Sequence, residues 1–161
     1  MLKPLPARPR LGFKAADHIA IVASRYNREF VEPMLAKALE EIVLILPESK
    51  TLVVHAPGSF EIPYLAGQLI QKTKPDAVIC LGVIFQGETV HANLIAASVG
   101  DALCRMSVEY ATPIIHGVLL LQNEEQAQER CLGSESNRGI EAARAAIEVI
   151  RASAAITTSG T

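Results

Sequence analysis

The sequence predicts a three-layer αβα sandwich built around a four-stranded parallel β-sheet. Apolar runs of strand length alternate along the chain with segments whose apolar residues recur every three or four positions. The strand runs are almost continuously apolar, which is typical of strands that helices bury on both faces. Because crossovers between parallel strands are right-handed, the connecting helices are expected on both faces of the sheet.

A leader with several prolines, residues 1–16, lacks both patterns and is predicted to be an N-terminal arm. The first strand is expected at Ile19–Ala23. The helix that follows has an apolar stripe at helical spacing and is expected to end near Pro47. Pro33 is expected in the first turn of that helix, where a missing N–H is tolerated.

Three further strands and four further helices follow the same alternation. Pro63 is expected in the first turn of its helix. Asn123 and Gln126 have the spacing of a capping box, which predicts a short helix through Arg130. In chain order we expect a strand at Thr51–His55, a helix from Ile62 to about Lys74, a strand at Ala77–Phe85, a helix from near His91 that stops before Pro113, a strand at Ile114–Leu121, the short helix, and a last helix marked by Ile140, Ala143, Ile147 and Ile150.

This order of elements is typical of the flavodoxin-like class, and the composition limits what such a domain binds. The 161 residues are half apolar with a net charge of -2, which predicts one compact soluble domain at residues 17–156 and a frayed polar tail at 157–161. Without clustered basic residues or tryptophan, a nucleic-acid surface is not expected. Neither a glycine–lysine phosphate loop nor a Rossmann glycine fingerprint follows the first strand, so no nucleotide cofactor is predicted.

Cysteine usage and the lengths of the apolar runs favour a cytoplasmic protein. Cys80, Cys104 and Cys131 are odd in number and lack the spacing of a zinc site or a redox pair. They lie among apolar neighbours and are predicted to be buried, reduced thiols. The start of the chain lacks the apolar core of a secretory signal, and no run approaches the roughly 20 apolar residues that cross a bilayer. Neither export nor membrane insertion is expected.

Polar and aromatic residues follow all four predicted strands. In a parallel sheet these strand ends share one edge, where small molecules bind. His91 opens a helix there, beside backbone N–H groups that can hold an anion. The segments concerned are Ser24–Asn27 after the first strand, Pro57–Glu61 after the second, Gly87–His91 after the third, and Gln122–Glu124 after the fourth, followed by Arg130 and Asn137–Gly139.

These segments resemble the lumazine synthase family in their order and spacing. The matching strings are Arg-Tyr-Asn, Pro-Gly-Ser-Phe-Glu-Ile-Pro, Gly-Glu-Thr-Val-His and Asn-Glu-Glu-Gln-Ala-Gln-Glu-Arg, and the match covers about Ile19 to Ile150. Each string alone is a weak signal, but their shared placement at strand ends makes a chance match improbable. The resemblance implies a step of riboflavin synthesis without cofactor or metal: 5-amino-6-(D-ribitylamino)uracil and 3,4-dihydroxy-2-butanone 4-phosphate condense to 6,7-dimethyl-8-ribityllumazine with release of phosphate and water.

The resemblance also implies roles for individual residues. His91 would transfer protons, since an imidazole exchanges them near neutral pH. Arg130 and the backbone of Glu88 and Thr89 would hold the phosphate. The remaining implied substrate contacts are Tyr26 and Phe60 against the pyrimidine, Ser59 and Glu61 at the ribityl chain, and Asn27, Val83, Ile84, Phe85, Gly87, His116 and Arg138.

Each of the main candidates also has a plain structural interpretation. Phe60 alone would more often be core packing, Arg130 a solvated helix residue, and Glu61 a carboxylate that favours a helix N-terminus. His91 alone would equally fit a backbone contact at the start of a helix. His18 and His55 are expected to be structural, because neither faces the proposed edge.

Four positions depart from the usual family pattern. Ala92 and Asn93 follow His91 where an aromatic and an acidic residue are common, so a carboxylate that would orient the imidazole is missing. Arg138 replaces a lysine, and its planar fork would contact a carbonyl differently from an ammonium. His116 replaces an aromatic residue in a region that the family contributes to the neighbouring subunit's site.

The resemblance implies a homo-oligomer with active sites between the subunits of a pentamer, and in some members a sixty-subunit shell. Two other functions stay open. The departures at His116 and after His91 would fit a catalytically weakened relative that binds a flavin-like ligand or forms a shell. The archaeal type of riboflavin synthase, which dismutates two lumazines, has a related pattern. Retention of His91, Phe60 and Arg130 favours the lumazine synthase reaction.

Overall fold

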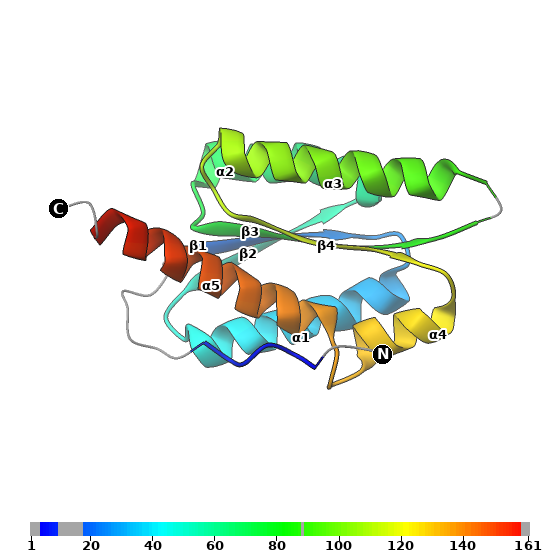
Figure 1. The fold of residues 1–161 in the computed structure, drawn as a ribbon, viewed down its shortest axis with the longest axis horizontal. Helices are drawn as coiled ribbons and strands as arrows, with labels where there is room; N and C mark the ends of the chain where they lie inside the picture. The colour runs from blue at the N-terminus through cyan, green and yellow to red at the C-terminus, as the bar shows by residue number, and fades with distance from the viewer. Residues whose placement is uncertain (1–3, 10–17, 88, 159–161) are drawn as a thin grey trace.

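The computed structural model describes residues 4–9, 18–87 and 89–158 of the chain, and they form a three-layer αβα sandwich (Figure 1). All strand pairs are parallel, and the strand order is β2-β1-β3-β4. The predicted flavodoxin-like class with a four-stranded parallel sheet is therefore confirmed. The strands are β1 (His18–Ser24), β2 (Lys50–Ala56), β3 (Ala77–Phe85) and β4 (Ile114–Leu121).

Helices cover both faces of the sheet (Figure 1). α2 (Ile62–Thr73) and α3 (His91–Glu109) lie on one face, and α1 (Arg28–Ile45) and α5 (Arg138–Thr158) lie on the other. A 3-10 turn, η1 (Ser59–Glu61), leads into α2. After β4, the short α4 (Glu124–Ala127) continues into a π-helical segment, η2 (Gln128–Leu132). None of the helices in the described parts of the chain has the length and apolar character needed to cross a membrane.

The central strands contribute side chains to two separate apolar cores. Ile21 and Ile79 face α1 and α5, whereas Val22 and Cys80 face α2 and α3. Successive side chains of a strand point to opposite faces, so a continuous apolar run supplies both cores. Each fully buried isoleucine or leucine stabilises the fold by about 1.5–3 kcal/mol relative to an exposed position. This double burial is why β1 and β3 were predictable from their continuous apolar runs.

Local signals placed most helix ends correctly. Pro63 lies in the first turn of α2, as predicted. Asn123 caps α4, because its Oδ1 accepts a hydrogen bond from the Gln126 N–H over 2.9 Å. The predicted short helix is less regular than expected: the α-helix ends at Ala127, and the wider turns of η2 carry the chain past Arg130.

Two predictions about single residues are wrong. Pro33 lies inside α1 rather than in its first turn, because the helix begins at Arg28, where the Asn27 carbonyl already accepts from the Phe30 N–H over 3.0 Å. Cys104 is exposed, whereas Cys80 and Cys131 are buried as predicted. Successive helix residues are about 100° apart around the axis, so the residue after a core position readily faces solvent.

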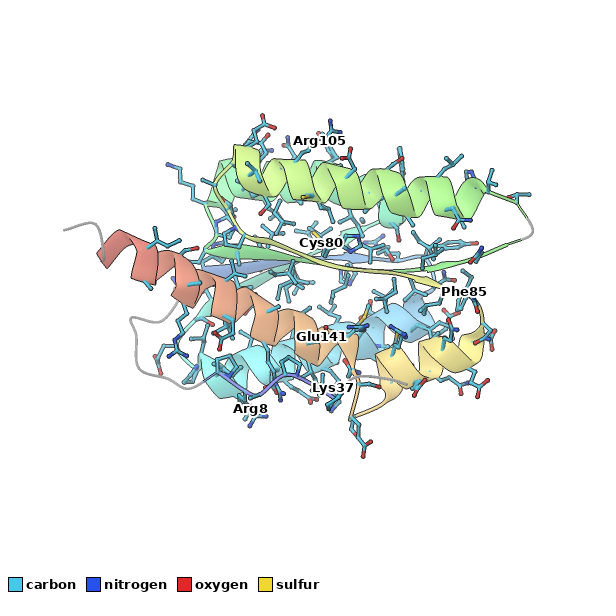
Figure 2. The ribbon with its side chains drawn as sticks, viewed as in Figure 1. Arg8, Lys37, Cys80, Phe85, Arg105 and Glu141 are labelled. Atoms are coloured by element: carbon cyan, nitrogen blue, oxygen red, sulfur yellow. The ribbon has the colours of Figure 1, made fainter. Side chains whose placement is uncertain are left out.

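Part of the predicted arm lies against the body of the molecule. Figure 2 shows Arg8 on the side of the sheet that carries α1 and α5. Its guanidinium donates two hydrogen bonds to the Glu41 carboxylate, over 2.7 and 3.1 Å. Arg144 of α5 donates to the same carboxylate over 2.8 Å and to the Pro6 carbonyl. The remainder of residues 1–16 and residues 159–161 lie outside the described parts, so the limits of the predicted domain stay a prediction.

Candidate active site

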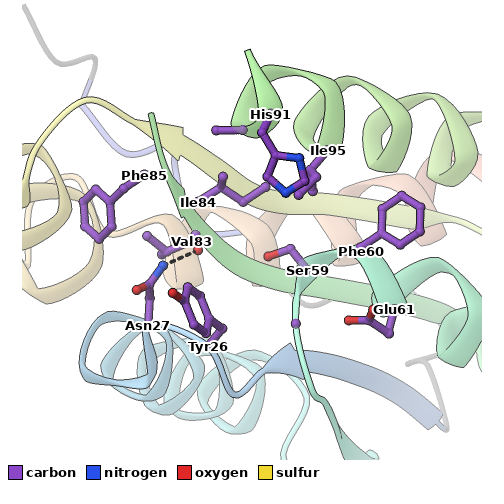
Figure 3. A pocket seen from close by; sticks show the side chains of 12 residues that line it. Tyr26, Asn27, Ser59, Phe60, Glu61, Val83, Ile84, Phe85, His91 and Ile95 are labelled. Carbon is purple, nitrogen blue, oxygen red and sulfur yellow. Dashed lines mark hydrogen bonds between the residues drawn. The ribbon is translucent and has the colours of Figure 1, made fainter. Parts of the chain in front are cut away.

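A cavity of about 510 Å³ lies at the carboxyl ends of the strands (Figure 3). The chain goes outward from β1 to β2 and then returns across β1 to β3 and β4, so the strand order reverses between β1 and β3. Open α/β sheets bind ligands at such a reversal. The cavity is lined by Tyr26, Asn27, Gly58, Ser59, Phe60, Glu61, Val83, Ile84, Phe85, His91, Ala92 and Ile95.

Nine of the predicted site residues therefore meet in one place, although they come from four separate segments. The β1–α1 turn supplies Tyr26 and Asn27, η1 supplies Ser59 to Glu61, the end of β3 supplies Val83 to Phe85, and α3 supplies His91. Each segment follows a strand or begins a helix at the same sheet edge. Parallel strand direction is what brings these distant parts of the sequence together.

Two aromatic side chains are left largely uncovered at this cavity. Tyr26 is 71% exposed and Phe60 is 61% exposed. The core-packing interpretation of Phe60 is therefore wrong for the single chain. Exposed aromatic faces favour a flat, apolar ligand surface, because its burial against them removes apolar area from water.

His91 is the first residue of α3 and is exposed. Its backbone N–H donates a weak hydrogen bond to the Thr89 Oγ1 over 3.4 Å, and the imidazole ring takes no part in that bond. In Figure 3 the imidazole points from α3 toward Ile84, while Tyr26 lies on the other side of the end of β3. The imidazole and the Tyr26 ring therefore flank the end of β3 within one cavity.

Ser59 is held close to β3 by the absence of a side chain at Gly82. A Cβ on Gly82 would lie 2.7 Å from the Ser59 Oγ and 3.3 Å from Ile62 Cδ1. A Cβ at this distance would require the Ser59 hydroxyl or its neighbours to shift, so glycine permits the approach without a displacement. As a result Ser59 is 7% exposed, although it lines the cavity.

The proposed phosphate ligands are only partly gathered in the structure. Gly87 and Thr89 are exposed in the loop before α3, and Glu88 lies outside the described residues. Arg130 is half-buried on η2 and does not line the cavity that holds His91. Behind it, burial raises the pKa of Cys131 to about 11, against a smaller opposing effect of the Arg130 charge.

His116 and Arg138 lie apart from the other candidates, at a second cavity of about 340 Å³. His116 is exposed on the edge strand β4, and its Nδ1 accepts a hydrogen bond from the Val118 N–H over 3.3 Å. Arg138 forms an ion pair with Glu141 one turn along α5. The two cavities share no lining residue; the second is lined by Ile115, His116, Gly117, Leu119, Arg138, Glu141, Ala142 and Ala145.

Asn137 fixes the junction from which Arg138 projects. Its side chain is fully buried, and its Nδ2 donates to the Cys131 carbonyl over 2.7 Å. Its Oδ1 accepts from the Gly139 N–H over 2.9 Å at the start of α5. One side chain thus provides hydrogen-bond partners for a backbone carbonyl of η2 and a backbone N–H in the first turn of α5.

Sequence reasoning missed nine cavity residues. Three of them, Gly58, Ala92 and Ile95, line the first cavity, and six line the second: Ile115, Gly117, Leu119, Glu141, Ala142 and Ala145. Ile95 lies one helical turn after His91, so helical spacing would have identified it. Across residues 4–9, 18–87 and 89–158, no three histidine, cysteine or acidic side chains are grouped as a metal site requires.

Comparison with known proteins agrees with the motifs at the strand ends. A family model described as 6,7-dimethyl-8-ribityllumazine synthase matches residues 17–154. Proteins of that name from two strains of Thermus thermophilus are 36% identical over 151 residues, which is 93% of this chain and 96% of theirs. Another, from Aquifex aeolicus, is 41% identical over 130 residues, which is 80% of this chain and 84% of that one. The chain therefore belongs to the 6,7-dimethyl-8-ribityllumazine synthase family.

Proposed function

We propose that this protein is the transferase that forms 6,7-dimethyl-8-ribityllumazine in riboflavin biosynthesis. Its substrates would be 5-amino-6-(D-ribitylamino)uracil and 3,4-dihydroxy-2-butanone 4-phosphate. The observation that carries the proposal is the cavity at the strand reversal, where Tyr26, Phe60 and His91 line one space. Family membership supports the same reaction.

The reaction requires several proton transfers and a fixed arrangement of two substrates. The primary amine of the pyrimidinedione attacks the ketone, and loss of water leaves an imine. Loss of the proton on C3 and elimination then release phosphate from the four-carbon unit, and the enol left behind becomes a methyl ketone by proton transfer to carbon. Attack of the ribitylamino nitrogen on the new carbonyl closes the ring and releases a second water. Each step moves a proton to or from nitrogen, oxygen or carbon, which an imidazole at the cavity can do.

We assign the proton transfers to His91 and the orientation of the pyrimidinedione to Tyr26 and Phe60. Glu61 is exposed at the start of α2 and would accept hydrogen bonds from the ribityl hydroxyls. The loop of Gly87 to Thr89 and Arg130 would hold the phosphate, because charge-assisted hydrogen bonds stabilise a leaving anion. Most of the acceleration would come from orienting two substrates, with acid–base catalysis adding about 10²–10⁴-fold.

We further propose that the second cavity completes the site of a neighbouring copy of the chain. The separation of His116 and Arg138 from the first cavity supports this arrangement, because one chain alone does not present all the candidate side chains together. Arg138 would contact a pyrimidine carbonyl across the contact. The assembly would be a pentamer or a sixty-subunit shell in the cytoplasm.

The test is a rate measurement with purified protein and both substrates, followed by lumazine absorbance above the uncatalysed background. We expect clear acceleration by the wild type and a loss of about 10²–10⁴-fold in His91→Ala. His55→Ala is the matched control, since His55 is paired with Glu32 over 3.1 Å and lies outside both cavities. It should keep most of the rate. A wild-type rate equal to background would refute the proposal.

Supplying lumazine alone separates the other candidates. Only a riboflavin synthase would make riboflavin from it by dismutation. Binding of lumazine without acceleration of its synthesis would support a ligand-binding or shell protein. We expect binding of the product but no riboflavin.

A further inference from the structure

Asn27 links two walls of the first cavity. It is the last residue before α1, with its backbone in the left-handed region at φ 55° and ψ 40°. Its side-chain Nδ2 donates a hydrogen bond to the Val83 carbonyl oxygen on β3 over 2.8 Å. Both residues line the cavity, and Figure 3 shows the bond crossing from the β1–α1 turn to β3.

This use of an asparagine before a helix is unusual within the chain itself. Asn123 also precedes a helix, but its backbone is extended, at φ −157° and ψ 170°, and its side chain caps α4. That is the ordinary arrangement for an asparagine cap. Asn27 makes no side-chain cap. Its amide bridges to β3 instead, from a left-handed backbone that asparagine tolerates better than most residues.

The bond extends the pairing of β1 with β3 beyond the point where the strand ends. The β1–β3 ladder stops at the pair Ala23 and Leu81, whereas β3 continues to Phe85 against β4. Val83 lies two residues past Leu81, so its carbonyl is directed to the same side. The Asn27 amide therefore occupies the place that a further residue of β1 would take.

Two neighbouring contacts hold the same turn. The Ser24 hydroxyl donates to the Tyr26 carbonyl over 3.2 Å. The ring of Phe30, in the first turn of α1, meets the ring of Phe85 edge-on, with 5.6 Å between centroids. With the Asn27 bond, these contacts fix how far the Tyr26 side of the cavity lies from the end of β3.

We propose that Asn27 is a positioning residue for the condensation. Through its left-handed backbone and its bond to Val83, it sets the width of the crevice between Tyr26 and β3, and so the orientation of the pyrimidinedione toward His91. This inference rests on the proposed function. It adds a second role to the substrate contact that resemblance implies for Asn27, because the bond to β3 uses one of the two Nδ2 hydrogens.

Two variants separate the backbone conformation from the bond. Asn27→Gly keeps the left-handed turn without strain but lacks the amide. Asn27→Asp tolerates the same backbone, yet it places an acceptor opposite the Val83 carbonyl. We expect kcat to fall about 10- to 100-fold in both variants, since small misplacements of a reacting group cost this much. The KM for dihydroxybutanone phosphate and the urea midpoint of unfolding should change little.

Lys74→Gly is the matched control. Lys74 also has a left-handed backbone, at φ 47°, but it ends α2 and lines neither the first nor the second cavity. Its replacement should leave kcat at the wild-type value. A loss of kcat in this control equal to that in Asn27→Gly would overturn the inference, since it would trace the effect to left-handed turns in general.

Two further results would also overturn it. One is a wild-type kcat in both Asn27 variants. The other is a crystal structure with bound pyrimidinedione in which the Asn27 Nδ2 has left Val83 and donates to the ligand. If the unmodified protein forms lumazine no faster than the uncatalysed background, the proposed function is refuted, and the inference that rests on it fails as well. These outcomes are distinguishable, because only the last concerns the unmodified protein.

Discussion

At the scale of single residues, the shape of the cavity depends on one missing side chain. Gly82 lies in the middle of the sheet, where a β-branched residue would ordinarily pack better. Its lack of a Cβ lets Ser59 approach β3 and brings η1 against the strand end. The β2–α2 turn, with Phe60 and Glu61, therefore lies at the cavity through a close contact that a Cβ at position 82 would disturb.

We predict that Gly82→Ala raises the KM for the pyrimidinedione several-fold and lowers the free energy of unfolding by about 1–3 kcal/mol. The new methyl group would meet the Ser59 Oγ at 2.7 Å, so we expect Ser59 to shift and to disturb the cavity that it lines. Steady-state kinetics and urea unfolding measure the two effects. Adding Ser59→Ala removes the atom that clashes, so the double variant should recover most of the lost stability. An unchanged KM in Gly82→Ala would contradict this account.

Residue-scale reasoning groups positions that follow directly from a strand end. Tyr26, Phe60 and His91 each come just after a strand or open a helix at one edge of the sheet, and they line one cavity as that placement predicts. Their roles in the reaction stay a prediction. The bond from Asn27 to β3 could not be foreseen, since Asn27 and Asn123 both precede a helix and differ only in backbone angles and side-chain partner, neither of which the local sequence reveals.

At the scale of elements, α1 and α5 approach so closely that their backbones nearly touch. A Cβ on Gly139 would lie 1.9 Å from the Met34 carbonyl oxygen and 2.8 Å from its carbonyl carbon. Backbone atoms cannot rotate away as a flexible side chain can. The first turn of α5, which carries Arg138, is thereby fixed against α1.

We predict that Gly139→Ala lowers the free energy of unfolding by about 3 kcal/mol or more, because the two helices must separate to admit the methyl group. Urea unfolding of the purified variant is the measurement. Gly67→Ala is the matched control: the nearest atom there is the flexible end of Met106 at 3.3 Å, so its cost should stay within about 1 kcal/mol. Equal losses of unfolding free energy in the two variants would show that the close approach of α1 and α5 does not determine the cost of the substitution.

Element boundaries were predictable where the apolar pattern is unbroken. β3 and β4 begin and end at the predicted residues, because both are flanked by turn residues or prolines. The start of α1 was placed too late, since its first two residues are charged and lie outside the apolar stripe. The π-helical turns of η2 were also not foreseen, as a capping signal marks where a helix begins but not how tightly it winds.

At the scale of the whole molecule, one buried carboxylate joins the arm to two helices. Glu41 is 3% exposed and accepts from Arg8 of the arm and Arg144 of α5, residues that lie 33 and 103 positions away in sequence. The hydrogen bond from Arg8 contributes most to lowering the pKa of the Glu41 carboxyl below its ordinary value of 4.5, with Arg144 adding to the effect and burial opposing it. No local pattern predicts such a contact.

We predict that Glu41→Gln lowers the free energy of unfolding by about 3–5 kcal/mol at neutral pH, because Arg144 loses a buried partner. The folded-state pKa is below the unfolded one, so this stabilisation is fully present above about pH 4.5 and is lost as pH falls through the folded pKa. Urea unfolding at several pH values should therefore show the difference between wild type and variant narrowing in acid.

Lys37→Ala is the control for that network. Lys37 pairs with Glu40 at the same 2.7 Å distance, but its side chain is 40% exposed and that of Glu40 is 60% exposed. Exposed pairs contribute at most about 1 kcal/mol, so the free energy of unfolding should hardly change at any pH. A pH-independent difference between wild type and Glu41→Gln would contradict the assignment of the stabilisation to the ionised carboxylate.

The division of candidate side chains between two cavities has a genetic consequence. If neighbouring copies share their sites as proposed, each working centre belongs to a contact between chains, and each chain serves two centres. A copy with substitutions in the candidate side chains of both cavities would inactivate the two active sites to which it contributes. In a cell that makes intact and damaged copies together, activity would fall faster than the proportion of damaged chains rises, so such alleles would act dominantly.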